Sequence, residues 1–204
     1  MPLFLAGTGA VAMTRTVIIT LLVWLSVALG VGLSGVFYRA PAPVIPGTLW
    51  TLVIVILLLF WRSEGFRQWV YRVDLRPLVL FHLTRFVGIW FLVLYSRGRL
   101  PYAFAVPGGW GDILAASGAL LVTLVFLPLR SRRDWWAVAI WNLLGLVDIL
   151  MVVFTGARLA LADIDSMVEL TAFPLNLLPL FIVPLIISTH VLIFARLRRE
   201  RPAL

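Results

Sequence analysis

Six long apolar segments constrain the fold of this chain more than any other feature of its sequence. A helix of about 20 apolar residues crosses the hydrocarbon core of a bilayer. The predicted spans cover residues 16–38, 46–61, 77–96, 111–129, 135–154 and 174–195. We therefore expect an all-α integral membrane protein, a bundle of six transmembrane helices in which residues 1–204 form a single membrane domain.

The composition supports a membrane protein. Hydrophobic residues make up 62% of the chain, against roughly 45–50% in a soluble domain. Cysteine is absent, so the chain has no disulfide, thiolate metal site or cysteine nucleophile. The sequence also lacks Gly-x-Ser-x-Gly and His-Glu-x-x-His motifs and a carboxylate cluster for two-metal chemistry. An enzymatic function is therefore not the first expectation.

The arginines predict how the spans are oriented. All 17 basic residues are arginines, and 16 of them flank the apolar segments, so the lipid bilayer is the expected partner and nucleic acid is not. Twelve lie on the side that holds both termini: Arg15, Arg62, Arg67, Arg72, Arg76, Arg130, Arg132, Arg133, Arg196, Arg198, Arg199 and Arg201. Four lie on the other side: Arg39, Arg97, Arg99 and Arg158. This bias predicts cytoplasmic termini in a bacterial cytoplasmic (inner) membrane.

Two further patterns concern surfaces of the bundle. Phe66, Trp69, Val70 and Val73 are spaced i, i+3, i+4, i+7, which predicts a short amphipathic helix in the membrane interface between spans 2 and 3. An ordinary juxtamembrane linker is the alternative.

Small residues recur every four positions at Ser26, Gly30 and Ser34 in the first span. Such a face lets another helix approach closely. We expect packing within the chain, with homodimerisation through the Ser26/Gly30/Ser34 face as the alternative.

Arg85 lies near the middle of the third span, where an unpaired charge costs several kcal/mol. From the helical rise, Arg85 is about 14 Å from the cytoplasmic face and Asp148 is about 6 Å further out. An arginine side chain covers this distance, so we expect an Arg85–Asp148 ion pair. The pair is either a structural link between spans three and five or part of a ligand site.

Three other polar residues share one depth on three helices. By the same rise, His82, Asn142 and His190 lie about 9–10 Å from the cytoplasmic face. Two histidines at equal depth are what axial ligation of haem b requires, so His82 and His190 are candidate axial ligands. The more ordinary expectation is that each histidine bonds a neighbouring residue, with no cofactor and no other metal; a proton relay is a third alternative.

The segment before the fourth span is too apolar for a solvated linker. It contains Pro101 and Pro107 and then three glycines, which predicts an irregular outer loop folded back on the bundle. Asp112 then opens the fourth span as an N-cap, with an ion or ligand contact as the alternative.

Several of these residues form a pattern that is similar to the motifs of a family of membrane proteins. The pattern is Arg85-x-x-Gly88, then Gly98-x-Leu100-Pro101-x-x-Phe104-Ala105-x-Pro107-x-Gly109-x-Gly111-Asp112, then Trp141-Asn142-x-x-Gly145-x-x-Asp148 and a final span with Pro184 and His190. It resembles a family of small uncharacterised bacterial membrane proteins with about six spans, over about residues 80–196. The resemblance implies no activity. A polar amide is common in that family where this chain has His82, which weakens the haem alternative.

The expected function is therefore non-enzymatic. We expect the protein to bind or transport a small or amphiphilic ligand, or to act as an accessory subunit of a membrane complex. Its polar centre would comprise Arg85, Asp148, Asn142, His82 and His190. The alternatives are a bis-histidine electron-transfer protein and an intramembrane lipid-modifying enzyme with His82 or His190 as base.

Overall fold

The structure is a computed structural model that describes the backbone of residues 3–200 and, except at Arg39 and Ile164, the side chains of residues 11–200. Every regular element in this range is helical, and no strand occurs in it. Six of its helices are long and apolar enough to cross a membrane. The predicted all-α, six-helix class is confirmed.

The elements follow one another as twelve helical segments within residues 3–200. They are α1 (Leu3–Leu33), η1 (Phe37–Arg39), α2 (Val44–Arg62), α3 (Glu64–Arg72), α4 (Leu75–Leu80), η2 (Phe81–Val87), α5 (Gly88–Ser96), α6 (Tyr102–Phe126), α7 (Arg132–Ala162), η3 (Ile164–Thr171), η4 (Leu178–Ile182) and α8 (Val183–Arg199). The third span is thus α4, η2 and α5 together, and the sixth is η4 followed by α8.

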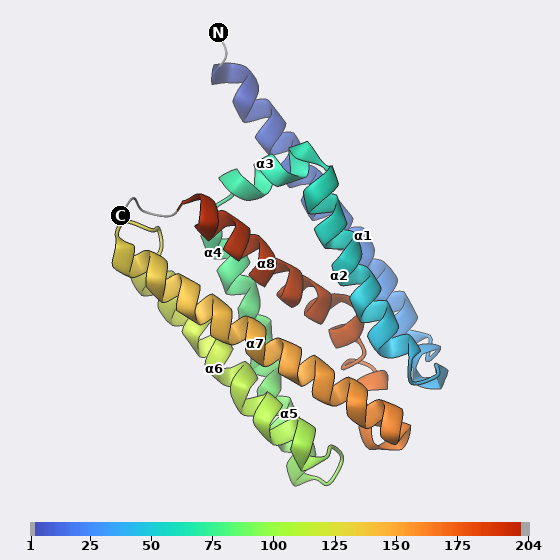
Figure 1. Ribbon diagram of the computed structural model, residues 1–204. Helices are drawn as coiled ribbons and strands as arrows, with labels where there is room; N and C mark the ends of the chain where they lie inside the picture. The colour runs from blue at the N-terminus through green and yellow to red at the C-terminus, as the bar shows by residue number, and fades with distance from the viewer. Residues whose placement is uncertain (1–2, 201–204) are drawn as a thin grey trace.

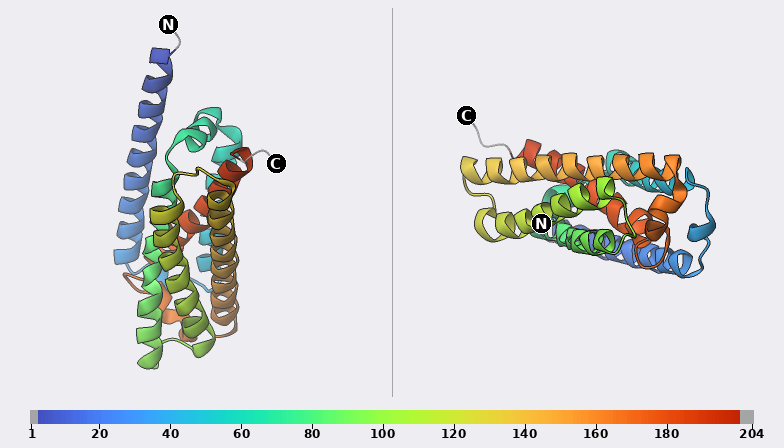
Figure 2. Two further views of the ribbon diagram at one scale, coloured as in Figure 1. Left: turned by 90° about the vertical axis from the view of Figure 1, so that its left-hand side faces the viewer. Right: turned by 90° about the horizontal axis from the view of Figure 1, so that it is seen from below.

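The helix α8 occupies the centre of the bundle. It packs against α7 on one side and α2 on the other, while α5, α6 and α7 lie side by side (Figure 1). The start of α1 and the end of α8 lie at the same end of the bundle (Figure 2), as an even number of spans requires. Because α8 has neighbours on opposite sides, it is the most buried of the six spans.

The first helix is the least buried span and contacts the bundle through one narrow face. Trp24 Nε1 donates to Leu180 O at 3.0 Å, Ala28 is buried, and Gly32 lies against Asn176. Asn176 Nδ2 donates to Gly32 O at 3.0 Å. These contacts show that α1 packs with a face other than the one the small-residue pattern favoured.

The Ser26/Gly30/Ser34 face does not pack within the chain, so that expectation was wrong. All three residues are exposed, and nothing lies within 4 Å of a Cβ built on Gly30. The hydroxyl groups of Ser26 and Ser34 donate to carbonyls of α1, at Leu22 and Val31. The bulky Trp24 instead faces the bundle, where its indole N–H donates to a carbonyl of η4. Homodimerisation through the exposed face stays a prediction.

The short helix between spans 2 and 3 is confirmed as α3, so the alternative of a linker was wrong. Ser63 caps it, because Phe66 N donates to Ser63 Oγ at 3.3 Å. Val70 is fully buried, and Phe66 and Trp69 pack partly against the bundle. The helix ends at Arg72, so Val73 is its C-cap.

The fourth span starts nine residues earlier than predicted. The helix α6 begins at Tyr102 and continues through Pro107 and the glycines that were expected to break it. Pro101 stands directly before the helix, and Phe104 N and Ala105 N donate to its carbonyl oxygen. Asp112 therefore lies within the helix and is not an N-cap. Close packing of α6 against α5 and α7 outweighs the poor helix propensity of these residues.

Candidate functional site

The third span changes its helical geometry where its polar residues lie. The segment η2 is a 3₁₀-helix, which has three residues per turn, so residues three apart lie on the same side. Its two buried residues, His82 and Arg85, are three apart, and the row of buried residues spaced by three continues with Val79 in α4 and with Gly88, Phe91 and Leu94 in α5. The change of geometry therefore aims both His82 and Arg85 into the bundle. Extended 3₁₀ segments within a helix often occur at functional or strained positions.

Arg85 is fully buried and bonds to both neighbouring helices. Its Nε donates to Asp112 Oδ1 of α6 at 2.7 Å, and its Nη1 donates to Gly145 O of α7 at 2.9 Å. Its Nη2 forms an ion pair with Asp148 of α7. The Arg85–Asp148 pair expected from depth is thus present in the structure.

Asp112 is the second carboxyl partner of Arg85, which was not predicted from the sequence. We call Arg85, Asp112 and Asp148 the charged centre. One guanidinium faces two carboxyl groups, so the centre has a net charge of −1 when both are ionised. Charged hydrogen bonds of this kind are short and strong, and three of them hold the guanidinium in one orientation.

Glycines let the three helices approach closely enough to form the charged centre. A Cβ on Gly88 would meet the backbone of Gly109 and lie 2.7 Å from the Cβ of Asp112. On the other side of α6, a Cβ on Gly111 would collide with the carboxyl group of Asp148. Side chains at either glycine would push α5 or α7 away from α6 and lengthen the bonds to Arg85.

The three residues predicted to share one depth do meet. His190 Nδ1 lies 2.8 Å from Asn142 Oδ1, and Asn142 Nδ2 donates to His190 O at 3.0 Å. His82 Nε2 lies 3.2 Å from Thr189 Oγ1. We call His82, Asn142 and His190 the histidine layer; each member is fully buried and has a neighbour to bond.

The arrangement of the two imidazoles does not support a haem between them. Their ring centroids are 4.1 Å apart and the rings touch directly, whereas paired axial ligands stand on opposite faces of a porphyrin. Each ring also uses one nitrogen on a protein neighbour. Among the described residues, no group of three or more histidine, aspartate or glutamate side chains is placed to hold a metal ion.

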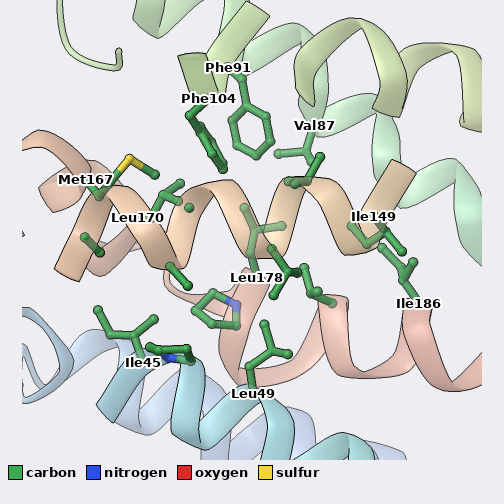
Figure 3. A pocket seen from close by; sticks show the side chains of 18 of the residues that line it. Ile45, Leu49, Val87, Phe91, Phe104, Ile149, Met167, Leu170, Leu178 and Ile186 are labelled. Atoms are coloured by element: carbon green, nitrogen blue, oxygen red, sulfur yellow. The ribbon is translucent and has the colours of Figure 1, made fainter. Parts of the chain in front are cut away.

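An apolar cavity of about 100 Å³ extends from the charged centre. Arg85 and Asp112 form part of its wall, and the other 18 lining residues carry no charge. Phe91 and Phe104 enter it from the α5 and α6 side, while Ile45 and Leu49 of α2 enter from the opposite side (Figure 3). Residues of η2, α7, η3, η4 and α8 complete the lining.

The structure brings the five predicted polar residues together but separates them into two groups. Arg85 and Asp148 belong to the charged centre, whereas His82, Asn142 and His190 lie beside it and do not line the cavity. Pro101 and Pro107 belong to neither group, since one precedes α6 and the other is exposed on it. The glycine-rich approach to Asp112 was the sequence signal for its role, because glycines allow the close packing that a buried ion pair needs.

Comparison with known proteins places the chain in a family. A family model described as a domain of unknown function (DUF8737) matches residues 42–198. The chain belongs to this family. The matched range holds all of the charged centre, the histidine layer and the cavity, and it excludes α1. No curated protein and no solved structure matches the chain.

Proposed function

We propose that this DUF8737 protein binds an amphiphilic ligand in the cavity beside the charged centre. The observation that carries the proposal is the composition of that wall: 18 uncharged lining residues meet Arg85 and Asp112 at one place. Apolar cavities of this order stay dry and accept small apolar groups. A hydrocarbon portion would therefore occupy the cavity, with its polar group at the charged centre.

The charged centre suits the polar end of such a ligand. A guanidinium has five N–H groups, and three of those on Arg85 are used by Asp112, Gly145 and Asp148. The remaining N–H groups can donate to a ligand oxygen, while the carboxyl groups hold the guanidinium in place. Because the guanidinium of Arg85 is already fixed in one orientation before a ligand binds, little binding free energy is spent on ordering the site.

The position of the two histidines outside the cavity supports ligand binding over the catalytic alternative. Neither His82 nor His190 lines the cavity, so neither ring faces the place where a ligand would lie.

We also propose the bacterial inner membrane and cytoplasmic termini for this protein. The support is the excess of arginines at the end of the bundle where α1 begins and α8 ends. An accessory role through the exposed face of α1 is a separate proposal, supported by the exposure of Gly30.

A cavity-filling substitution tests ligand binding. Ala157 of α7 lines the cavity, so Ala157→Leu places three more carbons in it. We expect the purified wild-type protein to retain an amphiphile through detergent exchange and Ala157→Leu to lose most of it, as measured by mass spectrometry of the extracted lipids. Each buried CH₂ of the displaced chain contributes about 0.8 kcal/mol to binding.

Ala162→Leu is the matched control, because Ala162 is exposed at the end of the same helix. It should retain as much amphiphile as the wild type. The thermal midpoint of ligand-free Ala157→Leu should stay level or rise, since filling a cavity restores contacts. Equal amphiphile content in wild type and Ala157→Leu would refute the proposal.

A further inference from the structure

A second concave site lies at the end of the bundle where α1 crosses α3. This groove has a volume of about 490 Å³ and lies between the two helices. Arg15, Ile18 and Ile19 line it from α1, and Trp69 and Arg72 line it from α3. It shares no lining residue with the apolar cavity beside the charged centre.

Two contacts hold the walls of the groove together. Trp69 Nε1 donates to Thr14 Oγ1 at 2.8 Å, which ties α3 to α1. Gly65 allows α3 to approach, because a Cβ there would lie only 2.9 Å from Met13 Cε. The groove is therefore formed by packed helices and does not depend on a loop.

The chemistry of the lining is that of a site for an anion with an apolar tail. Arg15 and Arg72 have no hydrogen-bond or ion-pair partner among the described residues, and no acidic residue belongs to the lining. Ile18 and Ile19 are exposed beside them. A guanidinium pair suits phosphate oxygens, and the isoleucines suit the first carbons of an acyl chain.

We propose that the groove between α1 and α3 binds the phosphate headgroup of an anionic membrane lipid. Arg15 and Arg72 contact the phosphate, Trp69 lies at headgroup depth, and the acyl chains run along Ile18 and Ile19. Amphipathic helices with tryptophan and arginine occupy this depth in membranes, and basic residues at the surface attract anionic lipids. The lipid would also join α1, which lies outside the matched family domain, to the rest of the bundle.

Native mass spectrometry of the full chain in mixed micelles tests the site. The probes are phosphatidylglycerol and phosphatidylcholine with identical chains. We expect tighter binding of phosphatidylglycerol, and about fivefold weaker binding in each of Arg15→Gln and Arg72→Gln, which corresponds to about 1 kcal/mol per arginine. Binding of phosphatidylcholine should be the same in all variants.

Arg62→Gln is the matched control, because Arg62 is exposed near the same end of the bundle and does not line the groove. It should bind phosphatidylglycerol as the wild type does. An equal loss in Arg62→Gln, or equal binding of the two lipids, would overturn the site. Displacement of the lipid by inorganic phosphate would overturn the lipid assignment in favour of a soluble anion. Ile18→Asn, which keeps both arginines, should also weaken binding, and unchanged unfolding midpoints would show that the variants fold.

Discussion

Removal of the guanidinium at Arg85 should destabilise this protein far more than removal of either carboxyl group. In Arg85→Leu, three hydrogen bonds are lost and the carboxyl groups of Asp112 and Asp148 stay behind with side-chain exposures of 4% and 27%. The carbonyl of Gly145 also loses its side-chain donor. Leaving one partner of a buried ion pair uncompensated costs about 3–5 kcal/mol.

Asp148→Asn is the informative contrast to Arg85→Leu. Its amide oxygen can still accept from Arg85, which keeps its bonds to Asp112 and Gly145. The net charge of the centre changes from −1 to zero when the other carboxyl group is ionised, which offsets part of the loss. We expect a cost of about 1 kcal/mol, the net value of one hydrogen bond. The two variants should therefore differ by about 2–4 kcal/mol.

Reversible unfolding in mixed detergent micelles, followed by helical circular dichroism, measures these free energies. A cycle with Arg85→Leu, Asp148→Leu and the double variant should be strongly non-additive, because the residues are in direct contact. Replacing Asp112 as well should recover part of the loss, since apolar side chains can substitute for a complete buried ion network. Strictly additive losses, or Arg85→Leu no costlier than Asp148→Asn, would refute this account of the charged centre.

Two further predictions concern packing and the histidine layer. Gly88→Ala places a methyl group against the backbone of Gly109 and should cost about 1–3 kcal/mol of unfolding free energy by overpacking. Gly30→Ala has open space around it and should stabilise the helix by up to about 1 kcal/mol, so equal effects in the same micelle assay would contradict the proposed close approach. Asn142→Leu removes both bonds to His190 and should cost about 1–3 kcal/mol in that assay, and a neutral result would show that the bonds are dispensable.

The relative levels of the polar residues along the bundle were predictable from the sequence. The rise per residue is nearly constant in a helix, so counting from the flanking arginines placed Arg85 within reach of Asp148 and put His82, Asn142 and His190 at one level. The structure contains the ion pair and the contact between the three residues of that layer. The amphipathic helix α3 was predictable for a similar reason, since its period appears directly in the sequence.

The boundaries of α6 were not predictable by the same means. Pro107 and the glycines that follow it are poor helix formers in water, yet they are well suited to a helix packed closely between two others. Because the fourth span was predicted to start at residue 111, Asp112 was interpreted as a helix cap and not as a partner of Arg85. The 3₁₀ segment of the third span was likewise not predictable, because residues 81–87 contain neither proline nor glycine to mark a change of helical geometry.

The all-α class, the six apolar helices and the relative levels of the polar residues thus depended on the sequence alone, because hydrophobic length and helical rise are local properties of the chain. The lateral arrangement depended on tertiary packing. Contacts between helices place Asp112 beside Arg85, set the exposed face of α1 and leave the cavity open between α2 and α7. Such contacts join residues far apart in the sequence, such as Arg85 and Asp148, and their geometry depends on the shapes of all the side chains between them.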